Sequence, residues 1–190
     1  MHFLKTYFDT IIAYDLINKF FYSNIRKLPC FTKVVLCLTR KNSNLRDLIS
    51  MILFFEILSN NKITTNNIIR YRKSNVFIKI KKGSPMGCKV VLRKNKVCDV
   101  FEFLYTDILT NEKNCKHAVV ASSNSLSLRV TNPMKIKELD RNFYSLFKNL
   151  PWLSITFFTT TETKEELNYL LKAYKLKNFI NCICNSIGRV

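Results

Sequence analysis

The chain has 190 residues, of which 47% are hydrophobic, and a formal net charge of +18 at pH 7. This length favours one domain with a substantial core, and the apolar content excludes wholesale disorder. A folded body with so much charge repulsion implies a partner that neutralises it, and a nucleic acid does so with release of counterions. The alternatives are an anionic membrane and a basic surface without a dedicated partner. The most apolar run, 48–55, is too short to span a bilayer, so no membrane insertion is expected.

The first half of the chain combines helical and strand patterns. Apolar residues at helical spacing predict a helix over 4–21, and alternation predicts a strand over 33–39. The apolar run within 45–58 is too long for a typical strand and fits a buried helix. Residues 62–71 are polar and rich in asparagine, which indicates a loop or an irregular edge.

The stretch from Lys62 to Lys96 contains eleven lysines and arginines and no acidic residue. Within it, 76–81 and 88–93 alternate apolar and polar side chains, which predicts two strands with one basic face. The side chains expected on the polar, RNA-facing surface are Phe77, Lys79, Lys81, Lys89 and Arg93. Those expected to pack on helices are Val76, Ile78, Ile80, Val90 and Leu92. Residues 83–87 have the composition of a turn.

The second half continues the mixture of helices and strands. A helical period predicts a helix over 97–109, and the lack of periodicity in 110–125 indicates an exposed loop. Strands are expected at 126–130 and 154–160, followed by a capped helix from Thr163 to about Tyr174. The fold class is therefore α+β: an antiparallel sheet with helices packed on one face and a basic opposite face on RNA.

Catalytic and metal-binding patterns are missing from the sequence. The seven cysteines are odd in number and several occupy apolar positions, as expected of reduced thiols. Cys182 and Cys184 have no second Cys or His pair at a matching spacing, so no zinc site is predicted. With two histidines, no carboxylate pair beside a nucleophile and no Gly-rich phosphate loop, we expect neither an enzyme nor a cofactor.

Several segments, in this order, resemble one protein family. They are Tyr22-Ser23-Asn24-Ile25, Lys33-Val34-Val35-Leu36, the basic G-x-P-x-G stretch 78–93, Phe101-Glu102-Phe103-Leu104, and 155–166. The sequence is similar to the large-subunit ribosomal protein family that binds 5S rRNA. The resemblance covers roughly residues 4–179, which suggests a single domain over 1–179 and a C-terminal extension over 180–190.

The resemblance implies a structural, non-catalytic component of the central protuberance. Its partners would be large-subunit rRNA, 5S rRNA where present, and neighbouring ribosomal proteins, including a small-subunit head protein across an intersubunit bridge. A loop would extend toward P-site tRNA. The richness in Asn, Lys, Ile and Phe is typical of an A+T-rich organelle gene, so we expect a mitoribosome in the mitochondrial matrix rather than a plastid ribosome. The alternative function is a free-standing RNA-binding or ribosome maturation factor with the same fold.

The candidate binding residues follow from the basic segments and from the resemblance. The RNA-binding candidates are Lys33, Arg70, Arg72, Lys73, Phe77, Lys79, Lys81, Lys82, Lys89, Arg93, Lys94 and Lys96. The candidates in the tRNA-facing loop are Lys113, Lys116 and His117. The chain departs from the family pattern at Cys37, where Asn is usual, and at Val91, where Thr is usual. Both departures remove hydrogen-bonding groups from the polar face, and the loop over 110–125 lacks the family's Gly and Arg.

Overall fold

The sheet and its helices are described for most of the chain. The computed structural model describes residues 3–40, 44–59, 62–74, 76, 80–103, 119–122, 124–131, 133 and 144–174. The strands are β1 (Phe31–Thr39), β2 (Ile68–Arg70), β3 (Pro85–Arg93), β4 (Val119–Ser122), β5 (Ser125–Val130) and β6 (Leu153–Thr159). The α-helices are α1 (Phe3–Tyr7), α2 (Ala13–Phe20), α3 (Leu45–Ser59), α4 (Asn95–Phe103), α5 (Tyr144–Phe147) and α6 (Lys164–Ala173). A π-helical turn, Phe8–Ile12, joins α1 to α2, and short 3₁₀ turns occupy Ile25–Lys27 and Thr65–Asn67.

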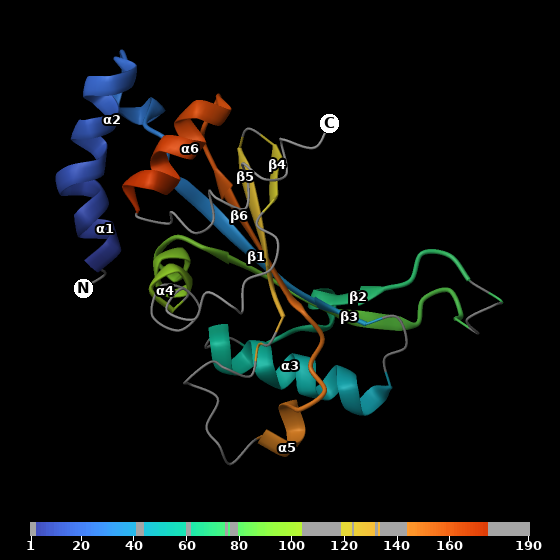
Figure 1. Cartoon of the computed structure of the whole chain (residues 1–190). Helices are drawn as coiled ribbons and strands as arrows, with labels where there is room; N and C mark the ends of the chain where they lie inside the picture. Colours follow the sequence, from blue (N-terminus) through green and yellow to red (C-terminus); the bar gives the residue numbers. More distant parts are fainter. Residues whose placement is uncertain are drawn as a thin grey trace.

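The six strands form one antiparallel sheet in the order β2-β3-β1-β6-β5-β4. The long central strand β1 pairs with β3 on one side and with β6 on the other (Figure 1). Alternate residues of each strand point to opposite faces, and the burial of the strands follows this period. The predicted α+β class with an antiparallel sheet is confirmed.

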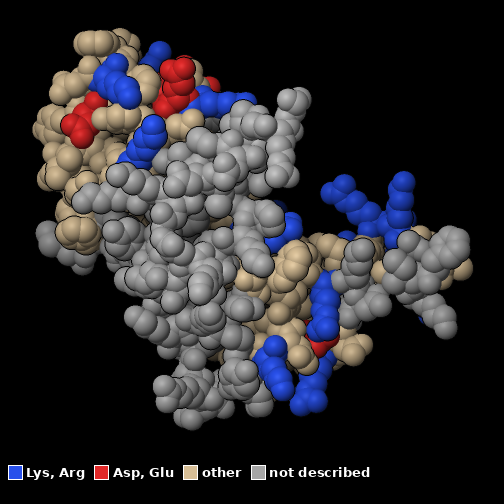
Figure 2. Space-filling view, in the orientation of Figure 1, with Lys and Arg blue, Asp and Glu red and all other residues tan. Residues whose placement is uncertain are grey.

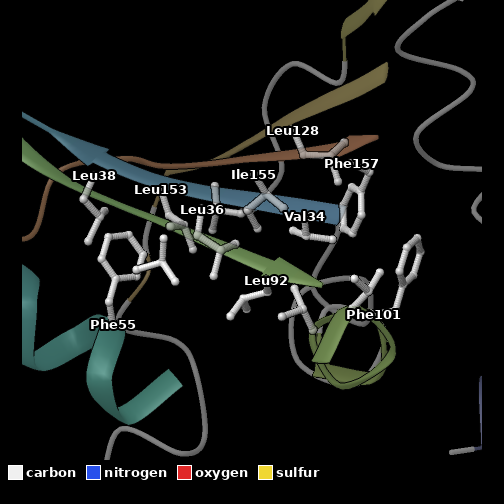
Figure 3. Packing of buried hydrophobic residues seen from close by; sticks show 14 of the residues in the cluster. Val34, Leu36, Leu38, Phe55, Leu92, Phe101, Leu128, Leu153, Ile155 and Phe157 are labelled. Atoms are coloured by element: carbon white, nitrogen blue, oxygen red, sulfur yellow. The ribbon is translucent and has the colours of Figure 1, made fainter. Parts of the chain in front are cut away.

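One face of the sheet is covered by helices and forms the main core. Leu36 of β1, Leu92 of β3 and Ile155 of β6 point toward the side chains of α3 and α4 (Figure 3). Helix α6 contributes Leu167 and Leu171 to the same core. The core residues predicted for β1 and β3 are buried, as are three of the apolar positions predicted for α4. They are Val34, Leu36, Leu38, Cys88, Val90, Leu92, Val97, Val100 and Phe101.

The N-terminal helices form an outer layer on α6. Ile12 and Leu16 are fully buried against Leu170 of α6. The predicted helix over 4–21 is therefore present, with a π-helical turn within it, and it ends where Phe21 adopts a left-handed conformation with φ of 49°. The predicted capping box is also present, because Thr163 accepts from the amide of Glu166 and the Glu166 carboxylate accepts from the amide of Thr163.

Two predicted segments are wrong in part. The first basic strand, over 76–81, is not continuous: Val76 lies in a turn with 88% of its surface exposed. Beyond Arg70 the hairpin leaves the sheet, so Val76 has no helix to pack against (Figure 1). The expected positions of Phe77, Ile78 and Lys79 lie outside the described residues. In place of the expected strand, β2 at the end of the segment 62–71 pairs with β3 as an edge strand with a register shift, which confirms the predicted irregular edge.

The second correction concerns the loop predicted over 110–125. Residues 119–122 form β4, which pairs with β5 as the last strand of the sheet. Its two valines are β-branched and favour a strand, although the segment is too short to show a period. Residues 110–118 lie outside the described residues. So does the end of the helix predicted over 97–109, of which α4 is the described part.

Candidate nucleic-acid interface

The face of the sheet opposite the core carries cations, hydroxyls and one phenylalanine. We call it the open face. Its side chains are Lys33, Val35, Cys37, Lys89, Val91, Arg93, Ser127, Arg129, Ser154, Thr156 and Phe158. The burial pattern of each strand assigns these residues, since their neighbours along the strand are buried in the core. None of them is acidic, so the open face has a single sign of charge.

The predicted strand cations meet at one end of this face. The register pairs Lys33 of β1 with Arg93 of β3 on one side and with Phe158 of β6 on the other. The Lys33 ammonium lies 4.5 Å from the centre of the Phe158 ring, a cation–π distance. Lys89 is exposed further along β3 and is paired in register with Cys37. The period-two pattern therefore placed Lys33, Lys89 and Arg93 on the correct face.

The other end of the open face was missed by the sequence reasoning. The Arg129 guanidinium lies 5.3 Å from the centre of the Trp152 ring, and Trp152 is 57% exposed. Between the two ends, the hydroxyls of Ser127 and Thr156 are 3.2 Å apart. Arg129 was not among the predicted candidates, and its contact with Trp152 requires β5 to lie beside β6, a strand order that local alternation does not reveal.

A second group of cations lies on the hairpin that leaves the sheet after β2. We call its described residues, 70–74, 76 and 80–84, the basic arm. Its base is held by hydrogen bonds between Tyr71 and both Gly83 and Ser84. The Arg70 guanidinium donates to the Gly83 carbonyl at 3.3 Å, and Gly83 has a φ of 84° that favours glycine. The exposed cations of the arm are Arg70, Arg72, Lys73, Lys81 and Lys82.

The space-filling view shows how cations and carboxylates are distributed over this side of the molecule, with cations also present among the carboxylates (Figure 2). Lysines and arginines extend along the projecting arm, whereas the visible carboxylates gather mostly at the end with α2 and α6 (Figure 2). The described part of the arm contains no acidic residue. The arm can therefore bring several cations against a polyanion without facing carboxylates of its own.

The remaining candidates differ in their surroundings. Lys94 is exposed in the turn between β3 and α4, with a φ of 57°. Lys96 is half-buried, and its ammonium donates to the Ser59 carbonyl at 3.2 Å, which joins the start of α4 to the end of α3. Lys96 thus has a structural contact that the sequence did not predict. The candidates outside the described residues are Phe77, Lys79, Lys113, Lys116 and His117.

The two departures from the family pattern fall on the open face. Val91 is 43% exposed there, and Cys37 is half-buried between Lys89 and Ser154 in the register. Burial raises the pKa of the Cys37 thiol, and the nearby Lys89 cation partly offsets this. Cys37 is therefore a neutral thiol near pH 7, and neither side chain offers the amide or hydroxyl expected from the resemblance.

In the described ranges, no group of three or more His, Cys, Asp or Glu side chains is arranged to hold a metal ion. None of the helices within these ranges combines the length and the apolar character needed to cross a bilayer.

Comparison with known proteins gives consistent relatives. The chain is 26% identical to the large ribosomal subunit protein uL5m of Reclinomonas americana over 93% of this chain and 97% of that protein. It is 28% identical to uL5 of Ehrlichia ruminantium over 94% of this chain and 99% of that protein. It is 28% identical to uL5 of Clostridium acetobutylicum over 89% of this chain and 93% of that protein. No protein-family model matches the sequence.

The class of protein follows from these relatives together with the fold. Every relative named above is a large-subunit ribosomal protein, which agrees with an α+β body whose open face carries cations. Within that class, these relatives are uL5 proteins, and the chain is similar to them at 26–28% identity over about nine-tenths of its length. The resemblance predicted from the sequence motifs is confirmed.

Proposed function

We propose that the protein is a structural constituent of the mitochondrial large ribosomal subunit, where it holds rRNA at the central protuberance through the open face and the basic arm. The observation that carries the proposal is that the open face and the described part of the basic arm both carry lysines and arginines and no carboxylate. Contacts of this kind neutralise phosphates and recognise shape, with little reading of base sequence.

The proposed partners are RNA and proteins of the ribosome. Large-subunit rRNA fits the cations of the open face, and the hydroxyls of Ser127 and Thr156 offer hydrogen bonds beside them. A contact with 5S rRNA, where this RNA is present, would be weaker than is usual because Cys37 and Val91 lack the expected polar groups. Neighbouring ribosomal proteins and a small-subunit head protein across an intersubunit bridge complete the proposed surroundings. The uL5m relative supports the mitochondrial assignment.

The tRNA contact is proposed to be weak. Glycine lets a backbone approach phosphate closely and arginine binds it with two donors, and residues 110–125 contain neither. Replacing Lys113, Lys116 and His117 together by alanine should leave the P-site tRNA occupancy of isolated ribosomes nearly unchanged. A several-fold drop in occupancy would show that this segment keeps the tRNA contact.

Sedimentation and the salt dependence of binding test the main proposal. The protein should comigrate with large subunits from a lysate at moderate salt, whereas a free-standing maturation factor would separate from mature subunits. In binding to duplex rRNA fragments, Lys81→Ala with Lys82→Ala should weaken affinity. The double replacement should also lower the log–log salt slope by about 0.9 for each phosphate that the protein no longer neutralises.

A matched control removes the same charge elsewhere. Lys164 and Lys172 are exposed on α6, away from the arm. Their double replacement by alanine should change affinity much less than replacement of Lys81 and Lys82. Equal losses for the two pairs would mean that only net charge matters, and the arm would then have no specific contact with RNA.

A further inference from the structure

A cavity lies where β1 begins and β3 ends, on the helix-covered side of the sheet. Its volume is about 460 Å³, and it opens between the N-terminal helix, the start of β1 and α4. Four aromatic rings, those of Phe8, Phe31, Phe101 and Tyr174, line it. Because protein interiors are normally packed without large voids, a cavity of this size within an aromatic cluster indicates space for a ligand.

The aromatic wall depends on an irregularity in β1. The register shifts between Phe31 and Lys33, so that Phe31 turns to the core side although Lys33 points to the open face. The Phe31 ring centre then lies 4.4 Å from that of Phe101 and 5.6 Å from that of Tyr174. The planes of Phe101 and Tyr174 are within 27° of each other. Phe101 is only 6% exposed, so the half-buried rings of Phe31 and Tyr174 provide the surfaces on which a planar ligand can stack.

The rim of the cavity is cationic. Lys5 and Lys94 line it and both are exposed, while Asp9 is the one carboxylate in the described lining. Lys94 has a φ of 57°, a left-handed conformation that is unfavourable for a lysine. Strained backbone of this kind is retained where the surrounding structure or a function requires it.

The rim begins one residue from the open face. Lys94 directly follows Arg93, which pairs in register with Lys33. A phosphate backbone bound by Lys33 and Arg93 can therefore continue past the end of β3 to Lys94 and Lys5, which both line the cavity. At that point an adjacent base would stand at the mouth of the aromatic cavity.

We propose that this cavity binds one unpaired nucleobase of the RNA strand whose phosphates lie on the open face. The inference rests on the proposed RNA-binding function and adds a second, base-stacking contact to it. Unpaired bases are commonly recognised by stacking on aromatic side chains with cations on the flanking phosphates. A partner protein inserting an aromatic side chain would fit the rings, but two lysines at the mouth favour a ligand that carries phosphates.

The phenol of Tyr174 can add a hydrogen bond to the base. Its surroundings raise the pKa of this phenol well above the usual value, mainly through burial and secondarily through Cys98 and Asp9. The hydroxyl therefore stays protonated at neutral pH and can donate as well as accept. Both abilities suit the edge of a nucleobase, which carries donors and acceptors side by side.

The test compares two RNA hairpins that differ in one base. One hairpin carries a single bulged fluorescent purine analogue, and the other has the same stem without the bulge. The full-length protein should bind the bulged hairpin at least about five-fold more tightly, the lower end of the stacking contribution of one base. The fluorescence of the analogue should be quenched on binding. Equal affinities and no quenching would overturn the inference.

Two variants separate the cavity from the rest of the surface. Cys98→Phe fills the cavity, because Cys98 lines it, and should abolish both the quenching and the preference for the bulge. Lys94→Gly removes one rim charge and also relieves the left-handed strain, so it should bind the bulged hairpin several-fold more weakly while melting at an equal or higher temperature. Lys172→Ala on α6 controls for the loss of one charge.

A measurement on the unmodified protein covers the case in which Cys98→Phe does not fold. The bulged hairpin should slow alkylation of Cys98, mapped by mass spectrometry, more than the unbulged hairpin does. Equal protection would contradict the inference, as would displacement of the analogue by a phenylalanine peptide but not by a single-stranded oligonucleotide. If neither hairpin binds, it is the proposed RNA-binding function that fails, which is a distinguishable result.

Discussion

Two segments of the basic stretch have the same alternating pattern and different structures. In β3 the apolar residues Val90 and Leu92 are buried, and the intervening cations face outward. In the segment 76–81 the pattern is as regular, yet Val76 is 88% exposed and Ile80 makes only a single β-bridge. Similar residues therefore give a central strand in one place and a projecting arm in the other.

The two segments differ in structure because they have different neighbours. β3 has β2 on one side, β1 on the other and α3 beneath it, so each alternate side chain has a core to enter. The arm continues past the end of the sheet, where Figure 1 shows no helix alongside it. A period of two gives a strand within a sheet only if one face can be buried, and Val76 in the arm has no core to enter.

The largest expected effect is on stability when a charge is placed in each segment. Leu92→Asp should unfold the protein, because an unpaired carboxylate in the core costs several kcal/mol of a total near 5–15 kcal/mol. Val76→Asp should change the free energy of unfolding by less than about 0.5 kcal/mol. Urea denaturation followed by circular dichroism measures both. A large loss for Val76→Asp would mean that the arm is packed in solution.

A glycine in the turn after the arm, Gly83, and a glycine within β3, Gly87, give the next contrast. A Cβ on Gly87 would collide with the backbone carbonyl of Leu38 and lie 2.9 Å from the Thr39 Cα. Gly87→Ala should therefore destabilise the protein by about 3 kcal/mol, since it forces β3 away from β1. Gly83 has open space around its Cα and a φ of 84°. Asparagine tolerates this conformation, so Gly83→Asn should cost only a few tenths of a kcal/mol.

The same unfolding measurement decides the glycine contrast. Similar losses for Gly87→Ala and Gly83→Asn would contradict the close approach of β3 to β1. That approach also explains the G-x-P-x-G pattern in physical terms: the first glycine supplies a left-handed turn, and the second lets two backbones meet.

The sequence predicted the parts of the fold that depend on local patterns. Alternation located β1, β3 and β6 to within a few residues, and the Thr163 capping box located the start of α6. The pattern missed β4 because four residues are too few to show a period. It also assigned 76–81 to the sheet, since a single sequence does not show where the core ends.

For the candidate site too, the sequence predicted only the features that depend on a single strand. The alternation of apolar and polar residues predicted that Lys33, Lys89 and Arg93 point away from the core, because this direction depends only on the strand that carries each residue. The contact between Arg129 and Trp152 depends on β5 pairing with β6, and strand order is a property of the whole fold. The aromatic cavity depends further on the bulge in β1, which turns Phe31 inward without any signal in the sequence.

A smaller effect is expected on the pH dependence of stability. Burial raises the pKa of the Cys88 thiol to about 11, and its hydrogen bond with the Lys89 backbone partly opposes this. A folded-state pKa above the unfolded value means that the stabilisation is complete below the unfolded pKa of about 8.5. It is then lost as the pH rises through the folded value of about 11.

Comparison with an alanine variant isolates this titration from the other groups that titrate at alkaline pH. Cys88→Ala loses packing at every pH but has no thiol to ionise. The stability gap between the unmodified protein and Cys88→Ala should therefore shrink by about 2–3 kcal/mol between pH 8 and pH 11. For Cys37→Ala the gap should shrink less, because the Lys89 cation favours the Cys37 thiolate. A gap that stays constant for Cys88→Ala would show that the thiol is not desolvated.

The smallest expected effect concerns the cations themselves. Replacing Lys81 and Lys82 of the arm by alanine should change the free energy of unfolding by less than about 0.5 kcal/mol, because exposed charges contribute little to folding. At low salt the change should be slightly stabilising, since a net charge of +18 repels itself, and it should vanish as salt screens the repulsion. Replacing Lys89 and Arg93 should have an effect of similar size. Urea denaturation at two salt concentrations measures both pairs, and a loss above about 1 kcal/mol would show that the cations hold the fold. If no such loss is seen, the two pairs of alanine replacements leave the protein folded and can serve in the RNA-binding measurements. The cations that repel one another in the free protein are also the ones that a phosphate backbone can neutralise.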